Sequence, residues 1–245
     1  MAIALVRFRP DMPRLLQVAA SRRFLPPGQD LGYALHAALT AAFGSNAPRP
    51  FRLLRTGLAG ELLGYCAASG AELEATASLP AIGEMADLVG ALRPQTLQVK
   101  AMPANWPNGL RLGFEIRVRP VVRIRPEGRD GRHHEIDVHE HRSREGGTEG
   151  EADREETYAA WLRERLERDG AVAMEAVSLV RYRALPVLRR PFDGERRRAA
   201  VALGPDAIMA GVLRVVDGEG VNRLLSSGVG RHKGFGFGML LLRPG

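Results

Sequence analysis

The sequence predicts an α+β fold in which one pattern of strands and helices occurs twice. Short segments alternate between apolar and polar residues, and segments with apolar residues at helical spacing separate them. The order strand, helix, strand, strand, helix, strand is found in each half of the chain, and this order defines the split βαβ unit. With 245 residues, 45% of them hydrophobic, the chain is long enough for two cores. We therefore expect two tandem ferredoxin-like (RRM-like) domains.

The first domain is predicted over residues 1–103. Its first strand spans residues 3–9 and ends at Pro10, which has no backbone N–H to donate. A well-defined helix follows at residues 31–43, with Asp30 as its cap and Gly44 as its stop. The other predicted elements are a helix at 14–23, strands at 51–54 and 62–67, a helix at 81–92 and a strand at 96–102.

The second domain is predicted over residues 108–245, after a boundary at 103–107. Residues near 126–154 are charged, rich in glycine and without periodicity, and we interpret them as a mobile insertion. Apolar residues at helical spacing then predict a helix that ends at Gly170. The remaining elements are strands at 110–124, 172–182, 210–216 and 235–243 and a helix at 219–226.

Charge and composition favour a polyanionic partner in the cytoplasm. The chain has 35 basic and 28 acidic residues, a net charge of +7, although a bias toward arginine can also reflect a GC-rich genome. Cys66 is the one cysteine, which excludes an intrachain disulfide and a cysteine-based zinc site. Nothing in the sequence resembles a membrane-spanning helix or a secretion signal. We therefore expect a cytoplasmic protein with no membrane partner.

The glycine-rich stretch at residues 228–238 is the most informative motif. Lys233 stands where a dinucleotide-binding fingerprint needs glycine, and no long helix follows, which also excludes a P-loop. Residues 233–237 match the start of an RRM strand signature. Flexible backbone beside cationic side chains can approach RNA phosphates, although a turn packed for entry into a strand is the alternative. The predicted RNA-binding residues are Gly228, Gly230, Arg231, His232, Lys233, Gly234 and Gly236.

The predicted helix at residues 31–43 presents a phenol and an imidazole together. Tyr33 and His36 lie one turn apart, on the side opposite the apolar stripe of this helix. A histidine can move protons near neutral pH, and a tyrosine beside it can orient a phosphate. Taken alone, the pair is more typical of a surface histidine next to an amphipathic tyrosine.

A histidine-rich stretch could suggest a metal site. It contains His133, His134, His139 and His141 with Asp137 and Glu140. The surrounding sequence is charged and irregular, which is typical of a solvated insertion. We expect neither a metal nor a cofactor.

Two of these segments together resemble the type I-E CRISPR repeat endoribonucleases, the CasE family of the RAMP superfamily. That family carries Tyr-x-x-His in its first helix, matched by Tyr33 to His36, and ends in a glycine-rich loop and strand, matched by residues 228–242. The likeness extends to residues 158–162 and 210–215, whereas residues 62–97 match loosely.

The resemblance implies a metal-independent endoribonuclease that binds the stem-loop of CRISPR repeat RNA and cleaves precursor crRNA. A ribose 2′-hydroxyl attacks the adjacent phosphate and a cyclic phosphate results, with Tyr33 and His36 as catalytic residues. Some members add a lysine, but none occurs before Lys100, so an arginine such as Arg22 or Arg23 could take that role. The implied partners are the crRNA and the other subunits of a Cascade complex.

Three alternatives stay open at this point. A non-catalytic RNA-binding subunit of a CRISPR ribonucleoprotein would share the loop without needing Tyr33 and His36. A structural ribonucleoprotein component with tandem ferredoxin-like domains, or a processing enzyme of another CRISPR type, would also fit.

Overall fold

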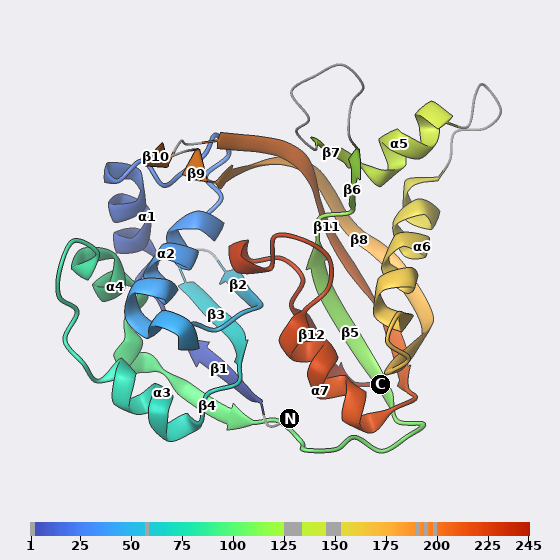
Figure 1. The fold of residues 1–245 in the computed structure, drawn as a ribbon, viewed down its shortest axis with the longest axis horizontal. Coiled ribbons are helices and arrows are strands. Elements are labelled where there is room, and N and C mark those ends of the chain that lie inside the picture. Colours follow the sequence, from blue (N-terminus) through green and yellow to red (C-terminus); the bar gives the residue numbers. More distant parts are fainter. Residues whose placement is uncertain are drawn as a thin grey trace.

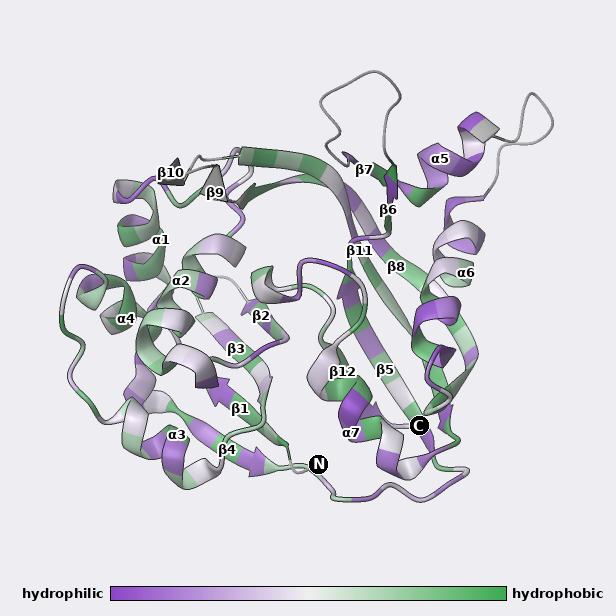
Figure 2. Ribbon diagram, viewed as in Figure 1, coloured by the Kyte–Doolittle hydropathy of each residue, from purple (hydrophilic) through white to green (hydrophobic). Residues whose placement is uncertain are grey.

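A computed structural model describes residues 3–56, 59–124, 134–145, 153–189, 192–193, 196–197 and 200–245 of the chain. Two four-stranded antiparallel sheets dominate it, one in each half of the sequence, with helices packed against them (Figure 1). The strands of both sheets alternate hydrophobic and hydrophilic residues, as Figure 2 shows. Within the described ranges, no helix is both long and apolar enough to cross a membrane.

The N-terminal sheet has the order β2-β3-β1-β4. Its strands are β1 (Ala4–Phe8), β2 (Phe51–Thr56), β3 (Ala59–Cys66) and β4 (Gln98–Ala101). Its helices are α1 (Met12–Ser21), α2 (Gly32–Phe43), α3 (Gly70–Ala77) and α4 (Ala86–Leu92), with short 3₁₀ turns at Gly44–Asn46 and Pro94–Thr96. The first and third strands occupy the centre, which is the predicted ferredoxin-like order.

The C-terminal sheet has the order β12-β5-β11-β8, which repeats the arrangement of the first. Its strands are β5 (Arg111–Val118), β8 (Val172–Arg189), β11 (Ala200–Val215) and β12 (Leu240–Pro244). Its helices are α6 (Arg154–Glu167) and α7 (Gly218–Ser227), and a 3₁₀ helix, η3, spans Lys233–Phe235. Smaller elements are β6 (Val121–Ile124), β7 (His134–Asp137), α5 (Val138–Glu145), β9 (Phe192–Asp193) and β10 (Arg196–Arg197).

The long hairpin of β8 and β11 connects the two halves of the molecule. In Figure 1 its strands leave the C-terminal sheet and arch over to the helices of the N-terminal domain. Leu188, near the end of β8, is 5% exposed and belongs to the same apolar cluster as Leu15 and Leu39 of helices α1 and α2. In return, Ile3 and Tyr65 of the N-terminal domain join the C-terminal core. Each core is therefore completed by the other half.

The structure changes the predicted elements between residues 70 and 92. One helix was predicted at 81–92, but the chain forms α3 earlier and begins α4 only at Ala86. Helix α3 starts with a capping box in which Ser69 and Glu72 satisfy each other's backbone N–H groups. That motif was readable in the sequence, so the missed helix was predictable.

The insertion predicted near residues 126–154 is partly ordered. The predicted strand 110–124 is broken at Pro120, which cannot donate a ladder hydrogen bond, and β6 then pairs with β7 in a separate two-stranded sheet. Residues 134–145 form β7 and α5, a largely hydrophilic helix in Figure 2. The rest of the predicted mobile segment, 126–133 and 146–152, lies outside the described residues.

The predicted final strand at 235–243 begins later than expected. Gly236 and Gly238 have φ values of 85° and 77°, in the left-handed region where a ladder cannot continue. The chain therefore stays a loop until Leu240, from which β12 pairs with β5.

Candidate functional site

Helix α2 meets the glycine-rich loop at the boundary between the domains. A side chain on Gly32 would collide with the carbonyl oxygen of Phe235, so glycine allows the helix and the loop to touch. The N-cap residue of α2 is Leu31 and not Asp30 as predicted, but the Asp30 carboxylate contacts both the first residue of the helix and the other domain. Its Oδ1 accepts a 2.9 Å hydrogen bond from the Gly32 amide, and its Oδ2 accepts a 3.0 Å hydrogen bond from Nη2 of Arg117. The site is thus fixed by strand β5 as well as by its own helix.

Tyr33 lies deeper than its position in the sequence suggests. It is 9% exposed and belongs to the N-terminal core, whereas the helical projection placed it away from the apolar stripe. Its ring meets Phe24 edge-on at 5.0 Å between centroids and stacks with Phe235 at 6.4 Å. The loop covers this second side of α2, which a projection of the isolated helix cannot show.

His36 and Arg49 face a common space beside Gly234. The His36 ring is half-buried, 5.1 Å from the ring of Phe235. A methyl group on Gly234 would lie 3.5 Å from Nδ1 of His36 and 3.7 Å from Nε of Arg49. Both residues line a cavity of about 240 Å³ that also includes Thr40. Glycine therefore leaves room for a third group between an imidazole and a guanidinium.

Lys233 adds a further cation close to this space. Its side chain is half-buried, and a methyl group on Gly228 would lie 3.1 Å from its Cδ. Burial lowers the pKa of Lys233 below its ordinary value of 10.5, and the charge of Arg49 lowers it further. Two cations that repel each other in this way mark a place suited to an anion.

Arg231 and His232 are held by one carboxylate of the insertion. Nε of Arg231 donates to Oε1 of Glu135 at 2.6 Å, and Nε2 of His232 lies 2.7 Å from Oε2. The side chain of His232 is fully buried, and its backbone has a φ of 62°. The structure therefore gives His232 the position of a residue that anchors the loop, and not one that can touch a ligand directly.

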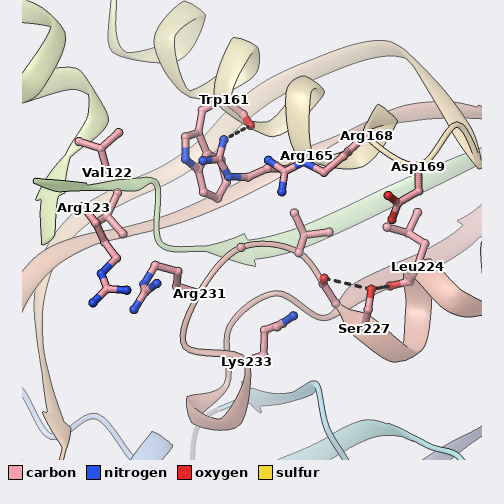
Figure 3. Close-up of a pocket in the computed structure, with 14 residues that line it drawn as sticks. Val122, Arg123, Trp161, Arg165, Arg168, Asp169, Leu224, Ser227, Arg231 and Lys233 are labelled. Carbon is pink, nitrogen blue, oxygen red and sulfur yellow. Dashed lines mark hydrogen bonds between the residues drawn. The ribbon is translucent and has the colours of Figure 1, made fainter. Parts of the chain in front are cut away.

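A basic pocket opens on the other side of the loop (Figure 3). It measures about 550 Å³ and is also lined by Trp161 and by Gly230, whose missing side chain would lie 2.9 Å from Cη2 of that indole. The guanidinium of Arg165 lies 4.2 Å above the Trp161 ring. Five cationic side chains border the pocket: Arg123, Arg165, Arg168, Arg231 and Lys233.

Sequence reasoning missed Arg49 and the arginines of helix α6. Arg49 follows α2 by a few residues but belongs to no periodic segment, so nothing in the sequence marks it. Arg22, one of the two arginines proposed for the third catalytic role, donates 2.7 Å and 3.1 Å hydrogen bonds to Asp87 of α4 and is engaged there. In the described part of the chain, no three His, Cys, Asp or Glu side chains form a group suited to a metal.

Comparisons with known proteins identify relatives along the whole chain. The family described as CRISPR associated protein matches residues 6–244. No curated protein matches the sequence.

Solved structures of similar fold cover nearly all residues of both chains. Cse3 of Thermus thermophilus, bound to an RNA representing a pre-cleavage complex, is 19% identical over 100% of each chain, with a TM-score of 0.61. Cas6e from Escherichia coli str. K-12 is 18% identical over 100% of each chain, with a TM-score of 0.54. A chain of a CRISPR RNA-guided surveillance complex in a pre-nicking state is 19% identical, covers 98% of this chain and 99% of that one, and has a TM-score of 0.56. At these identities the likeness shows the fold, and it confirms the tandem ferredoxin-like architecture.

Proposed function

Because the chain belongs to the CRISPR-associated protein family, as its resemblance to the CasE enzymes predicted, we propose that it is a metal-independent endoribonuclease. Its substrate is the stem-loop of CRISPR repeat RNA, and its reaction releases crRNA from the precursor. The observation that carries the proposal is the space beside Gly234, which faces both His36 and Arg49 and lies next to a cationic loop. An imidazole, a guanidinium and room for a phosphate are what cleavage by a ribose hydroxyl requires.

The reaction needs no external nucleophile. The 2′-oxygen forms a bond to the adjacent phosphorus, the bond from phosphorus to the 5′-oxygen breaks, and a 2′,3′-cyclic phosphate remains. The 2′-hydroxyl gives up a proton and the leaving 5′-oxygen takes one. His36 serves one of these two transfers, as general base or general acid. Tyr33 is wedged between Phe24 and Phe235, a rigid position from which it orients the scissile group.

We assign the third catalytic role to Arg49. Negative charge grows on the phosphate oxygens as the fifth bond to phosphorus forms, and a fixed cation stabilises that charge most in a site from which water is largely excluded. Nε of Arg49 and Nδ1 of His36 both lie within 4 Å of the position that Gly234 leaves open. A planar guanidinium can hold two phosphate oxygens at once, which suits this role as well as the lysine of some CasE members does.

RNA binding is assigned to the glycine-rich loop and the basic pocket beside it. Lys233 and Arg231 line that pocket together with Gly228 and Gly230, while His232 keeps the loop in place. We further propose that the protein stays with its product as part of a Cascade complex. Support for this comes from the family and from the fold shared with a chain of a CRISPR RNA-guided surveillance complex.

Single-turnover cleavage of a labelled repeat RNA in excess EDTA tests the proposal. The wild-type protein should give one discrete product ending in a cyclic phosphate. His36→Ala should lower the rate by about 10²–10⁴-fold with little loss of RNA binding, because a general acid–base group contributes that much. Thr40→Ala is the matched control, since Thr40 lines the same cavity one turn along α2.

Three results would reject the assignment. Cleavage at the wild-type rate in His36→Ala would remove the catalytic role of this helix. Strict dependence on added Mg²⁺ or Zn²⁺ would replace the mechanism by metal-assisted hydrolysis. Tight RNA binding without any product would identify a non-catalytic RNA-binding subunit.

A further inference from the structure

A second basic cavity lies between the two domains, on the other side of Phe235. It measures about 880 Å³ and extends from residues 28–32 along strand β2 to the C-terminal sheet. Strand β2 and the arch formed by β8 and β11, which both contribute lining residues, can be followed in Figure 1. We call it the arginine groove, after the five arginines that line it: Arg52, Arg55, Arg117, Arg181 and Arg183.

The carboxylates around the arginine groove are too few to neutralise these cations. Three of the arginines share Asp206, which is fully buried: Arg117 at 2.6 Å, Arg183 at 2.8 Å and Arg181 at 3.9 Å. Arg117 also pairs with Asp30 at 3.0 Å, and Glu115 pairs with Arg52 at 3.1 Å. In the described part of the chain, five arginines therefore face three carboxylates, a surplus of two positive charges.

Arg52 is the arginine of the groove that has a buried nitrogen without a hydrogen-bond partner among the described residues. Its side chain is 6% exposed, and Nη2 donates to Glu115. The other terminal nitrogen, Nη1, is buried and meets no hydrogen-bond acceptor among the described residues. Burial lowers the pKa of Arg52 to about 10, and the neighbouring charge of Arg117 contributes to this shift. Buried N–H donors are almost always paired in proteins, so an acceptor from outside the chain is expected here.

We propose that the arginine groove binds a phosphate of the RNA backbone, with Nη1 of Arg52 as a donor. Arginine is the side chain best suited to this ligand, because its donors form a fork that matches two phosphate oxygens. The volume of the groove admits several connected groups, which favours a segment of nucleotide chain over a single free anion.

The groove is also adjacent to the proposed cleavage site. Phe51 lines both the arginine groove and the cavity that contains His36. Two consecutive residues of the loop divide between them: Gly234 lines the His36 cavity and Phe235 lines the groove. If the scissile phosphate of an RNA chain lies beside Gly234, the neighbouring nucleotides can therefore reach the arginine groove. This inference rests on the proposed function, because it uses the same RNA.

Two substitutions that remove the same ion pair give opposite expectations. Arg52→Gln removes the proposed phosphate donor, so RNA affinity should fall by roughly tenfold or more, as expected for one hydrogen bond to a charged group. The slope of log affinity against log salt should also decrease by about one unit or slightly less. Glu115→Gln leaves Arg52 without its carboxylate, so RNA should bind more tightly. A purely structural ion pair predicts a loss for both variants.

The measurement uses the full chain with His36→Ala, so that the host's own repeat RNA is bound but not cut. Fluorescence anisotropy in EDTA gives the affinity at several salt concentrations. Arg111→Gln and Glu175→Gln are the matched controls, because these residues form a 2.8 Å ion pair that involves the same strand, β5, outside the groove. Each control changes the net charge of the protein by one unit, and neither should change the RNA affinity by more than the small effect of that charge. In a parallel series, the thermal unfolding of each variant is measured with and without inorganic phosphate.

The outcomes separate the possible sources of phosphate. Weaker RNA binding by Arg52→Gln with tighter binding by Glu115→Gln supports the proposal, and the second result alone decides it if Arg52→Gln does not fold. Equal losses in both variants overturn it. Unchanged RNA affinity, with stabilisation by inorganic phosphate lost in Arg52→Gln, assigns the groove to a free anion and overturns the RNA assignment. If the parent protein binds no RNA, the proposed function itself fails, whereas RNA binding that ignores Arg52 removes this inference alone.

Discussion

Nη2 of Arg117 donates a 3.0 Å hydrogen bond to Oδ2 of Asp30, which connects central strand β5 of the second domain to the start of helix α2 in the first. Both side chains are mostly buried, with 13% and 6% of their surfaces exposed. The same carboxylate accepts the Gly32 amide, so one residue holds the helix and joins the domains. Helix α2 is therefore positioned by a residue that precedes it and by a strand far away in the sequence.

Replacing Asp30 should destabilise the protein more than removing an ordinary helix cap does. Asp30→Ala should lower the free energy of unfolding by about 3 kcal/mol or more, because it breaks a buried ion pair as well as the bond to Gly32. Asp11→Ala is the control, since Asp11 caps α1 through the Arg14 amide at 3.1 Å and its loss should cost about 1 kcal/mol. Urea unfolding of both variants measures the difference. Equal costs would show that the Arg117 contact adds nothing.

Arg49 should affect the rate more than the binding of RNA. Arg49→Ala should lower the single-turnover cleavage rate by about 10²–10³-fold, the range seen when one donor to a developing negative charge is removed. Arg49→Lys should recover part of this loss, because it restores the charge without the fork of donors. Arg9→Ala, at an exposed position after β1, controls for the change in net charge. A loss confined to affinity would make Arg49 a binding residue instead.

Lys233 should make RNA binding sensitive to alkaline pH. Burial and Arg49 lower its pKa, so the ammonium loses its proton at a lower pH than a solvent-exposed lysine does. The charged form is present below that pKa, and its contribution to affinity is lost as the pH rises toward it. Affinity should therefore fall as the pH rises from neutrality toward this lowered pKa. In Lys233→Arg the decline should disappear, because arginine keeps its charge throughout this range. Equal pH profiles would exclude Lys233 as the titrating contact.

Glu135 and His232 should act on RNA as one unit. The carboxylate holds both Arg231 and the buried His232, so removing either partner should loosen the same loop. We expect His232→Ala and Glu135→Gln to weaken RNA binding by similar factors and their combination to be far from additive. Saturating protein should restore the cleavage rate of His232→Ala. A rate that stays low at saturation would place His232 in the chemistry.

The neighbouring Arg231 and Lys233 allow the loop itself to be tested. The double variant Arg231→Ala/Lys233→Ala should bind RNA more weakly and with a smaller salt dependence, because fewer counterions are released. An unchanged affinity and salt slope would show that the loop does not hold RNA.

The sequence was sufficient for what depends on short-range patterns. Alternating apolar residues predicted the strand order, and the pattern of residues 31–43 predicted helix α2, because each is determined within a few residues. The length of the β8–β11 hairpin was not predictable, since Pro186 and Pro205 normally mark the ends of strands. Here both prolines are accommodated in the pairing of the two strands, where Pro186 lies opposite Leu203 and Pro205 opposite Ala184.

The parts of the site that escaped prediction depend on contacts between elements. Arg49 becomes a neighbour of His36 only when Gly234 of the C-terminal loop is placed against α2. Arg52 is a candidate binding residue only because the other domain brings Glu115 and Arg117 next to it. No periodicity within one segment contains this information.

The position of Leu188 means that the N-terminal core cannot be complete before much of the second domain has been synthesised. The first 103 residues contain the helices and the sheet of the N-terminal domain, but the apolar cluster that they form includes a side chain that is synthesised much later. A nascent N-terminal domain therefore waits, with part of its interior uncovered, until the β8–β11 hairpin emerges and docks. Synthesis of the second domain thus completes the core of the first, and Phe235 can stack with Tyr33 only after the glycine-rich loop has been synthesised.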